Sequence, residues 1–192
     1  DTLIPRPDTE LIVENILNFS KHKNNINILD IGIGSGCILL SILKERKNFY
    51  GTGIDISKNC LKIANMNARN LKVHTRLKLY KSNVDKFTLG KYDLIVSNPP
   101  YIPLSETKEV GASTQKHEPD LALYTSDNKG IEFYEAIARF ARKNLKKDGV
   151  VFCEINEFRK SETIDCFRKE TFEEINCIKD MQGKDRVLLA KL

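Results

Sequence analysis

The stretch Ile28–Ile38, ILDIGIGSGCI, places three glycines between two apolar runs. The residues Ile26–Ile31 predict a short buried strand, and Cys37–Glu45 predict a helix. Glycine permits a tight turn of the backbone and lets a ligand approach without a Cβ in the way. The following helix points its first backbone N–H groups toward the same place. The stretch therefore predicts a ligand-binding loop between a strand and a helix.

Strand and helix patterns alternate through the rest of the chain, which predicts a mostly parallel sheet covered on both faces. The last two strands are separated only by a turn around Gln182 and Gly183, which predicts a hairpin with one antiparallel member. We therefore expect an α/β doubly wound sheet of seven strands over residues 1–192, as a single domain with an added helix within residues 1–22. The remaining predicted strands are Tyr50–Ile56, Thr75–Lys81, Tyr92–Ser97, Val150–Ile155, Glu174–Lys179 and Arg186–Leu192, and the remaining helices are Lys58–Asn70, Glu132–Leu145 and Ser161–Lys169.

Composition limits the kind of protein. A length of 192 residues with 41% hydrophobic and 30% charged residues is ordinary for one soluble domain. No apolar run is long enough to span a bilayer and no secretory leader opens the sequence, so we expect a cytoplasmic protein without a membrane partner. We also expect a monomer. An organellar location stays open, because the sequence begins with Asp1 and not with methionine.

Cysteines, histidines and lysines add no separate site. Five scattered cysteines without a C-x-x-C pair indicate reduced thiols, and three distant histidines give no metal-ligand spacing. We therefore expect no metal. The net charge of +5 comes with lysines along the whole chain, which favours a solvated surface over a dedicated nucleic-acid face.

Two carboxylates accompany the glycine loop. Asp30 precedes the loop, and Asp55 ends the second predicted strand, where a carboxylate can accept both hydroxyls of a ribose. The dinucleotide fingerprint is G-x-G-x-x-G, whereas Gly32, Gly34 and Gly36 give G-x-G-x-G. Both kinds of fold use the second acid, so Asp55 alone does not separate them. The tighter spacing, with Asp30 in front, resembles the adenosylmethionine loop of class I methyltransferases and implies S-adenosyl-L-methionine as cofactor.

The stretch after the third predicted strand is a candidate for contact with the adenine ring of the implied cofactor. Class I enzymes commonly place an acid there that accepts from the adenine amino group, but this chain has Ser82 and Asn83. The amide of Asn83 either contacts the base edge or is a plain loop group. The cofactor-binding residues that the resemblance implies are Asp30, Gly32, Ile33, Gly34, Ser35, Gly36, Asp55, Ile56, Asn83, Val84 and Asn98.

The turn Asn98-Pro99-Pro100-Tyr101 follows the fourth predicted strand and should lie at the same sheet edge. Prolines fix φ and remove N–H donors, so the turn is stiff and its carbonyls are free to accept. The Asn98 side-chain oxygen and the Pro99 carbonyl can each accept one hydrogen of a planar NH₂ group, and Tyr101 offers a flat face. Methyl transfer to a weakly nucleophilic nitrogen needs such fixed acceptors. These four residues are the candidate catalytic and substrate-binding residues.

The turn also occurs in adenine-N6 methyltransferases of DNA and RNA, so alone it predicts only a nitrogen acceptor. The flanking stretches narrow the class. Together with the glycine loop they resemble the protein-(glutamine-N5) methyltransferases that modify peptide chain release factors, over nearly the whole chain. These stretches are TLIPRPDTE at 2–10, SNPPYIP at 97–103, HEPDLAL at 117–123 and GKDRVLL at 183–189.

This resemblance implies methylation of the glutamine in the Gly-Gly-Gln motif of a release factor, with that protein as partner and no direct nucleic-acid partner. It implies that Arg6, Thr9 and Glu10 line the part of the cofactor site that holds the methionine end. It further implies that Glu118 binds the substrate and, with Pro119, shapes the mouth of the pocket, with loop packing as the alternative role. Asp185 and Arg186 are interpreted as a brace for the final hairpin.

Departures from the family pattern leave alternatives open. Asn83 replaces the usual acid, Asn156 replaces the glycine that usually ends the Glu-Ile-Gly stretch, and the helical N-terminal domain of the family is expected to be absent from this chain. The alternative functions are adenine-N6 methylation of DNA or RNA, glutamine methylation of a ribosomal protein, and a catalytically idle binding module. Flipping a base out of a duplex needs recognition contacts that the sequence does not display.

Overall fold

A seven-stranded sheet in the order β3-β2-β1-β4-β7-β9-β8 organises the protein. The computed structural model describes residues 7–103, 124–125 and 130–192. Strands β1, β2, β3, β4 and β7 are parallel, and β9 runs antiparallel to both β7 and β8. The predicted doubly wound sheet with one antiparallel member is confirmed. The strands are β1 Asn27–Ile31, β2 Tyr50–Asp55, β3 Leu77–Lys81, β4 Tyr92–Ser97, β7 Leu145–Glu154, β8 Glu174–Lys179 and β9 Asp185–Lys191.

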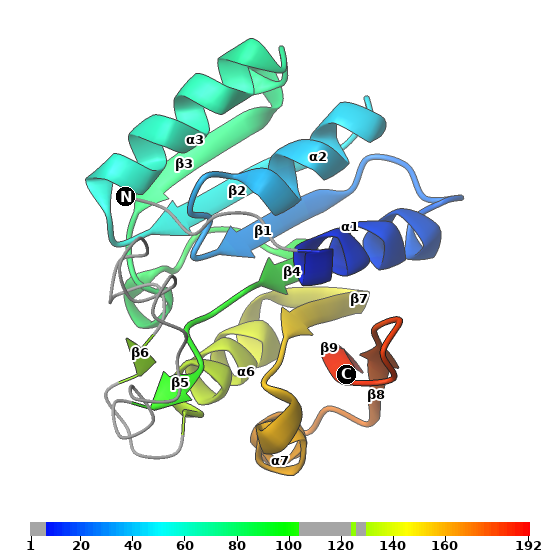
Figure 1. Cartoon of the computed structure of the whole chain (residues 1–192). Coiled ribbons are helices and arrows are strands. Elements are labelled where there is room, and N and C mark those ends of the chain that lie inside the picture. The colour runs from blue at the N-terminus through cyan, green and yellow to red at the C-terminus, as the bar shows by residue number, and fades with distance from the viewer. Residues whose placement is uncertain (1–6, 104–123, 126–129) are drawn as a thin grey trace.

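Helices cover both faces of the sheet (Figure 1). Helices α1, α2 and α3 lie on one face and α6 and α7 on the other. No helix in the described ranges is long and apolar enough to cross a membrane. The helices are α1 Pro7–Phe19, α2 Cys37–Glu45, α3 Lys58–Asn70, α6 Glu132–Asn144 and α7 Lys160–Lys169, with short 3-10 turns η1 His74–Arg76, η2 Val84–Lys86 and η4 Glu157–Arg159.

The core consists of two apolar layers, one on each side of the sheet. Ile12 and Ile16 of α1 pack with Leu39 of α2 in the first layer, and Tyr134 of α6 packs with Phe167 of α7 in the second. All five side chains are fully buried. Because both faces of the sheet are covered, its central strands are apolar on both sides and only their ends are open to ligands.

The third strand begins later than its sequence predicts. Thr75 alternates with its neighbours as a strand would, but it lies in η1, and β3 starts at Leu77. The cause is Arg76, whose guanidinium donates to the carbonyl oxygens of Arg46, Phe49 and Leu43 at 2.6–3.0 Å. These bonds hold the segment in a turn, because they satisfy carbonyls at the C-terminal end of α2 and in the loop that follows it.

Two further differences concern strands. β7 begins at Leu145, five residues before the predicted start at Val150, and contains Asp148 at φ +65°. A separate parallel pair, β5 Ile102–Pro103 with β6 Tyr124–Thr125, begins directly after Tyr101. A strand of two residues leaves no periodic pattern, so the sequence could not predict this pair.

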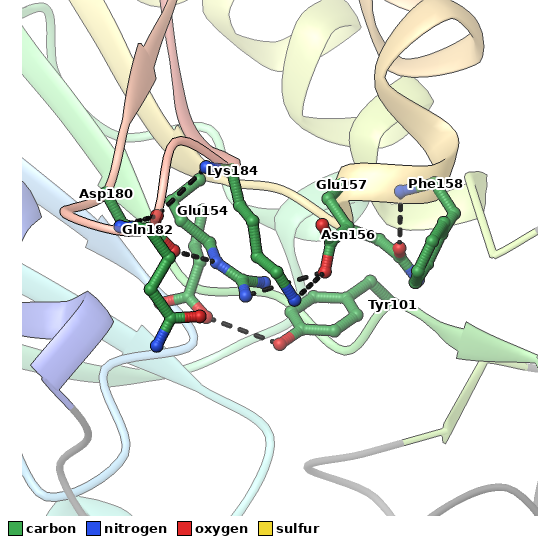
Figure 2. Close-up of polar contacts among 9 residues, drawn as sticks. Tyr101, Glu154, Asn156, Glu157, Phe158, Asp180, Gln182 and Lys184 are labelled. Carbon is green, nitrogen blue, oxygen red and sulfur yellow. Dashed lines mark hydrogen bonds and ion pairs between the residues drawn. The ribbon is translucent and has the colours of Figure 1, made fainter.

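Ion pairs fasten the final hairpin to the segment after β7 (Figure 2). The Arg186 guanidinium contacts Asp180 at 3.0 Å and Glu157 at 3.6 Å, and Lys184 Nζ contacts Glu157 at 3.0 Å. Asp185 pairs with Lys160 of α7 at 2.9 Å. The interpretation of Asp185 and Arg186 as a brace for the hairpin is confirmed.

Candidate active site

One cavity of about 550 Å³ opens at the carboxyl ends of β1, β2, β3 and β4. This volume suits a small-molecule ligand or cofactor. The fold brings most of the predicted site residues together around it, although they come from five separate segments. The predicted residues that line the cavity are Thr9, Asp30, Gly32, Ile33, Gly34, Ser35, Asp55, Ile56, Asn83, Val84, Asn98, Pro99 and Pro100.

Five predicted site residues are not among those that line it. Gly36, Glu10 and Tyr101 are described but do not belong to the cavity wall. Arg6 and Glu118 lie outside the described residues, so their predicted roles stay predictions.

The glycine loop has the backbone that the sequence predicts. Gly32 and Gly34 have φ of +73° and +55°, a region that other residues rarely adopt. A Cβ on Gly32 would meet nothing within 4 Å, and one on Gly34 only its own loop carbonyl at 3.9 Å. Both glycines therefore present bare backbone to the cavity.

Gly36 has a role in helix packing. A Cβ on this residue would lie 2.8 Å from the side chain of Leu40 and 3.5 Å from that of Ala64. It has φ of +84° and stands at the N-cap of α2. The absence of a side chain on Gly36 therefore gives Leu40 of α2 its place beside the loop, and the predicted contact of Gly36 with the cofactor stays a prediction.

Asp55 connects the glycine loop to the end of β2. Its Oδ2 accepts from the Gly34 N–H at 3.0 Å, and its Oδ1 accepts from the Ser57 N–H at 2.8 Å. Each carboxylate oxygen has a second lone pair, so both can still accept from a ligand hydroxyl. Asp55 thus holds the loop in shape and keeps acceptors available in the cavity.

Asp30 is a buried acid at the end of β1, only 2% exposed. Burial raises its pKa from 3.8 to about 7, an interaction with the Leu39 backbone opposes the rise, and the nearby Asp55 charge adds to it. Near neutral pH a change in the charge of the cavity therefore changes the protonation of this group.

The cavity is electronegative. Carboxyl groups of Asp30, Asp55, Asp85, Glu132 and Glu135 line it, whereas the cationic side chain described in its wall is that of Arg139, which pairs with Asp85 at 3.5 Å. A phosphate-bearing dinucleotide would be repelled by such a wall, and a cationic ligand is attracted. The charge of the described part of the wall therefore favours a positively charged ligand.

Asn83 has a structural task besides its place in the cavity wall. Its Oδ1 accepts from the Lys86 N–H at 3.0 Å and caps η2. The NH₂ group of the side chain is a donor and not the acceptor that the usual acid provides. Because the Oδ1 has a second lone pair, the side chain offers both an acceptor and a donor, and its contact with an adenine ring stays a prediction.

The acceptor turn, residues 98–101, begins where β4 ends, beside the glycine loop. The Ser97 hydroxyl donates to the Ile31 carbonyl at 2.7 Å and is fully buried, so the last residues of β4 and β1 are tied together. The side chain of Asn98 is half-buried in the cavity wall with Pro99 and Pro100. Tyr101 turns toward β7 instead, where its hydroxyl donates to Glu154 Oε1 at 3.4 Å (Figure 2).

Helix α6 supplies a wall that the sequence did not predict. Its first two turns line the cavity with Glu132, Phe133, Glu135, Ala136 and Arg139. These residues lie more than thirty positions after the acceptor turn and form no motif. Glu132, Glu135, Ala136 and Arg139 stand at i, i+3, i+4 and i+7 and share one helix face, but nothing in that pattern separates a cavity wall from a core face.

Metal chemistry has no visible ligand set at this site. Among the residues described, no group of three or more histidine, cysteine, aspartate or glutamate side chains is arranged to hold a metal ion.

A glycine loop, a carboxylate after the second strand and an acceptor turn after the fourth, grouped on one electronegative cavity, are features of a class I methyltransferase domain. A family model described as "Methyltransferase small domain" matches residues 7–184. The chain is 39% identical to the release factor glutamine methyltransferase of Flavobacterium psychrophilum and 40% identical to that of Lactococcus lactis subsp. lactis. These alignments cover 98% of the chain and 67% and 69% of the two relatives. The chain belongs to the release factor glutamine methyltransferase family.

Solved structures agree on the fold. A ribosomal protein L11 methylase from Lactobacillus delbrueckii subsp. bulgaricus has a TM-score of 0.70 at 19% identity, covering 98% of this chain and 80% of that one. The hMettl16 catalytic domain in complex with MAT2A 3'UTR hairpin 6 has a TM-score of 0.76 at 17% identity, covering 98% and 71%. At this low identity the likeness concerns the fold alone.

Proposed function

We propose that this protein transfers a methyl group from S-adenosyl-L-methionine to the side-chain nitrogen, N5, of the glutamine in the Gly-Gly-Gln motif of a peptide chain release factor. The observation that carries the proposal is that Asn98, Pro99 and Pro100 line the same cavity as Gly32 and Gly34. The names of the relatives support a release factor as the substrate. The chemistry of the cavity supports the cofactor and the reacting nitrogen.

The residues present fit the proposed cofactor. When bound, S-adenosyl-L-methionine supplies an activated methyl group on a positively charged sulfur, and it carries an ammonium group. Asp55 has lone pairs left for ribose hydroxyls, and the bare backbone of Gly32 and Gly34 leaves room beside it. Ile56 and Val84 give the cavity apolar surface for a base. The excess of carboxyl groups in the wall favours the two positive charges.

The acceptor turn suits a glutamine amide, whose nitrogen is a weak nucleophile because its lone pair is delocalised. The Asn98 Oδ1 and the Pro99 carbonyl each accept one N–H of the amide and hold the nitrogen facing the cavity. As the nitrogen becomes more positive, both hydrogen bonds strengthen, which favours the transition state over the bound substrate. The proton becomes acidic during bond formation, so no strong base is needed.

Cofactor affinity should depend on pH through Asp30. Below its pKa of about 7 the carboxyl is neutral, and above it the carboxylate attracts the cationic cofactor. We expect cofactor binding to tighten by up to about tenfold for each pH unit between about pH 5.5 and 7. In this range the cofactor ammonium stays protonated. Titration calorimetry with S-adenosyl-L-methionine at several pH values measures the effect.

Asp30→Asn is the control for this pH dependence. It should flatten the affinity profile and bind less tightly than wild type at pH 7.5 and above. The same variant has a stability readout without cofactor: the unfolded chain releases the Asp30 proton near pH 3.8 and the folded chain near 7, so ionisation costs stability between these values. Above pH 7, Asp30→Asn should therefore be more stable than wild type, by up to roughly 4 kcal/mol. If wild type and Asp30→Asn show the same dependence of cofactor affinity on pH, the assignment of this dependence to Asp30 is contradicted.

A transfer assay tests the proposed function. The protein is incubated with methyl-labelled cofactor and a release factor, with the Gly-Gly-Gln glutamine replaced by alanine in a parallel sample. We expect label on the intact release factor, on the peptide that carries the motif, and none on the alanine variant. Label on DNA, RNA or a ribosomal protein instead would favour the corresponding alternative. Absence of cofactor binding in calorimetry would favour an idle binding module.

A further inference from the structure

The acceptor turn is held at two points outside the cavity. One is the Tyr101 hydroxyl, which donates to Glu154 at the end of β7 (Figure 2). Glu154 is 3% exposed, so this contact ties the ring to the interior of the sheet. The other point is the backbone of Tyr101, which lies against Gly130, a residue about thirty positions further along the chain.

Gly130 has no room for a side chain. A Cβ built on it would lie 2.6 Å from the Tyr101 carbonyl oxygen and 3.3 Å from the ring atoms Cδ and Cγ of Pro103. Carbon and oxygen atoms do not approach to 2.6 Å without overlap, and the partner is backbone that has no rotamer with which to move away. Gly130 also has φ of +69°, which glycine adopts at low cost. Both the conformation and the contact therefore require glycine.

The position of Gly130 connects the acceptor turn to the wall of the cavity. It precedes Ile131, the N-cap of α6, and Glu132 and Phe133 in the first turn of that helix line the same cavity as Asn98 and Pro100. The close approach at Gly130 thus sets the distance between the two groups of residues that face the substrate.

We propose that Gly130 is a positioning residue for the acceptor turn. Its missing side chain lets the Tyr101 backbone rest against the start of α6, and this contact holds Asn98 and Pro99 at the depth in the cavity that the reacting nitrogen requires. Gly130 acts through Tyr101 and does not contact the substrate. The inference rests on the proposed function for its catalytic readout, but the contact itself can be tested independently.

Gly183 offers a matched control. It has φ of +82°, similar to that of Gly130, but a Cβ there would meet nothing within 4 Å. Gly130→Ala and Gly183→Ala therefore introduce comparable backbone strain, and only Gly130→Ala pushes on the acceptor turn. We expect Gly130→Ala to lower kcat about 100-fold. Its affinity for the product adenosylhomocysteine should stay at the wild-type value, and Gly183→Ala should keep the wild-type kcat.

A spectroscopic measurement reports on Tyr101 without any methyl transfer. Fluorine NMR of protein labelled with fluorotyrosine gives one signal for each tyrosine, and Tyr101→Phe identifies the signal of Tyr101. This signal should shift in Gly130→Ala and stay in place in Gly183→Ala. If Gly130→Ala does not fold, Gly130→Asn replaces it, because asparagine tolerates positive φ better and carries the same Cβ.

The outcomes separate the two proposals. If wild-type protein methylates no release factor, the proposed function fails, and the Tyr101 signal still decides the positioning role. Turnover in Gly130→Ala equal to that of Gly183→Ala would overturn the inference. So would a Tyr101 signal that does not move, or a loss of turnover accompanied by an equal loss of adenosylhomocysteine affinity.

Discussion

We expect Asn98→Ala to lower kcat for methyl transfer by about 10³-fold, with little change in cofactor affinity. The expected loss is large because the Asn98 amide is one of two acceptors that the turn offers to the substrate nitrogen, and its hydrogen bond strengthens as that nitrogen becomes positive. Cofactor affinity is spared because the glycine loop and Asp55, which fit the cofactor, lie on β1 and β2 and are held by their own hydrogen bonds. Single-turnover transfer at saturating cofactor, with calorimetry on the same samples, measures both quantities.

Asn98→Leu is the matched control, since leucine has nearly the size of asparagine but accepts no hydrogen bond. If the acceptor oxygen is what matters, Asn98→Leu is as inactive as Asn98→Ala. If Asn98 only fills space in the cavity wall, Asn98→Leu restores turnover. Near-normal turnover in either variant would refute the role assigned to this side chain.

Asp55→Ala should weaken cofactor binding by about 100-fold. The carboxylate accepts from Gly34 and Ser57, so its removal leaves two backbone N–H groups of the site without their acceptor and also removes the groups proposed to bind the ribose. Loss of charge-assisted hydrogen bonds of this kind is worth about 1.5–3 kcal/mol each. Titration calorimetry with adenosylhomocysteine measures the affinity in the absence of turnover.

Asp93 provides the control for Asp55. Its carboxylate also accepts from a backbone N–H, that of Asn27 at 2.8 Å, and pairs with Lys146, but it lies at the amino ends of β1 and β4, away from the cavity. Asp93→Ala should therefore lower stability and leave cofactor affinity unchanged. If both variants lose affinity equally, the effect of Asp55→Ala reflects general loosening of the sheet and not a direct contact.

The fold was largely predictable because local signals and tertiary packing agree. The bounds of α2 and α3 match their predicted ranges, and the start of α3 is marked by Ser57, whose side chain accepts from the Cys60 N–H at 3.3 Å. The predicted start of β3 was wrong because three long-range hydrogen bonds of Arg76 override the local alternation of apolar and polar residues. Such bonds join segments about thirty residues apart and have no counterpart in a sequence window.

The site was predictable in part for a similar reason. Gly32, Gly34 and Asn98 follow a strand and Asp55 ends one, and the carboxyl ends of parallel strands meet at one sheet edge. The cofactor contact predicted for Gly36 stays a prediction, because a glycine that faces a ligand and one that faces a neighbouring helix look alike in a sequence. The wall supplied by α6 could not be predicted, since it depends on how that helix lies across the sheet.

The strand order at the hairpin edge has a consequence for biosynthesis. Strand β8 hydrogen-bonds within the sheet only to β9 in the part of the chain that is described, and β9 lies between β7 and β8 although it is translated last of the three. On the ribosome, β8 emerges before β9 has been synthesised. It therefore has no partner strand until residues 185–191 insert between β7 and β8. At this edge of the sheet the strands therefore assemble in an order that differs from the order of synthesis. In a nascent chain that stops before Asp185, the last four residues of β7, Val151–Glu154, form an unpaired and largely apolar strand edge.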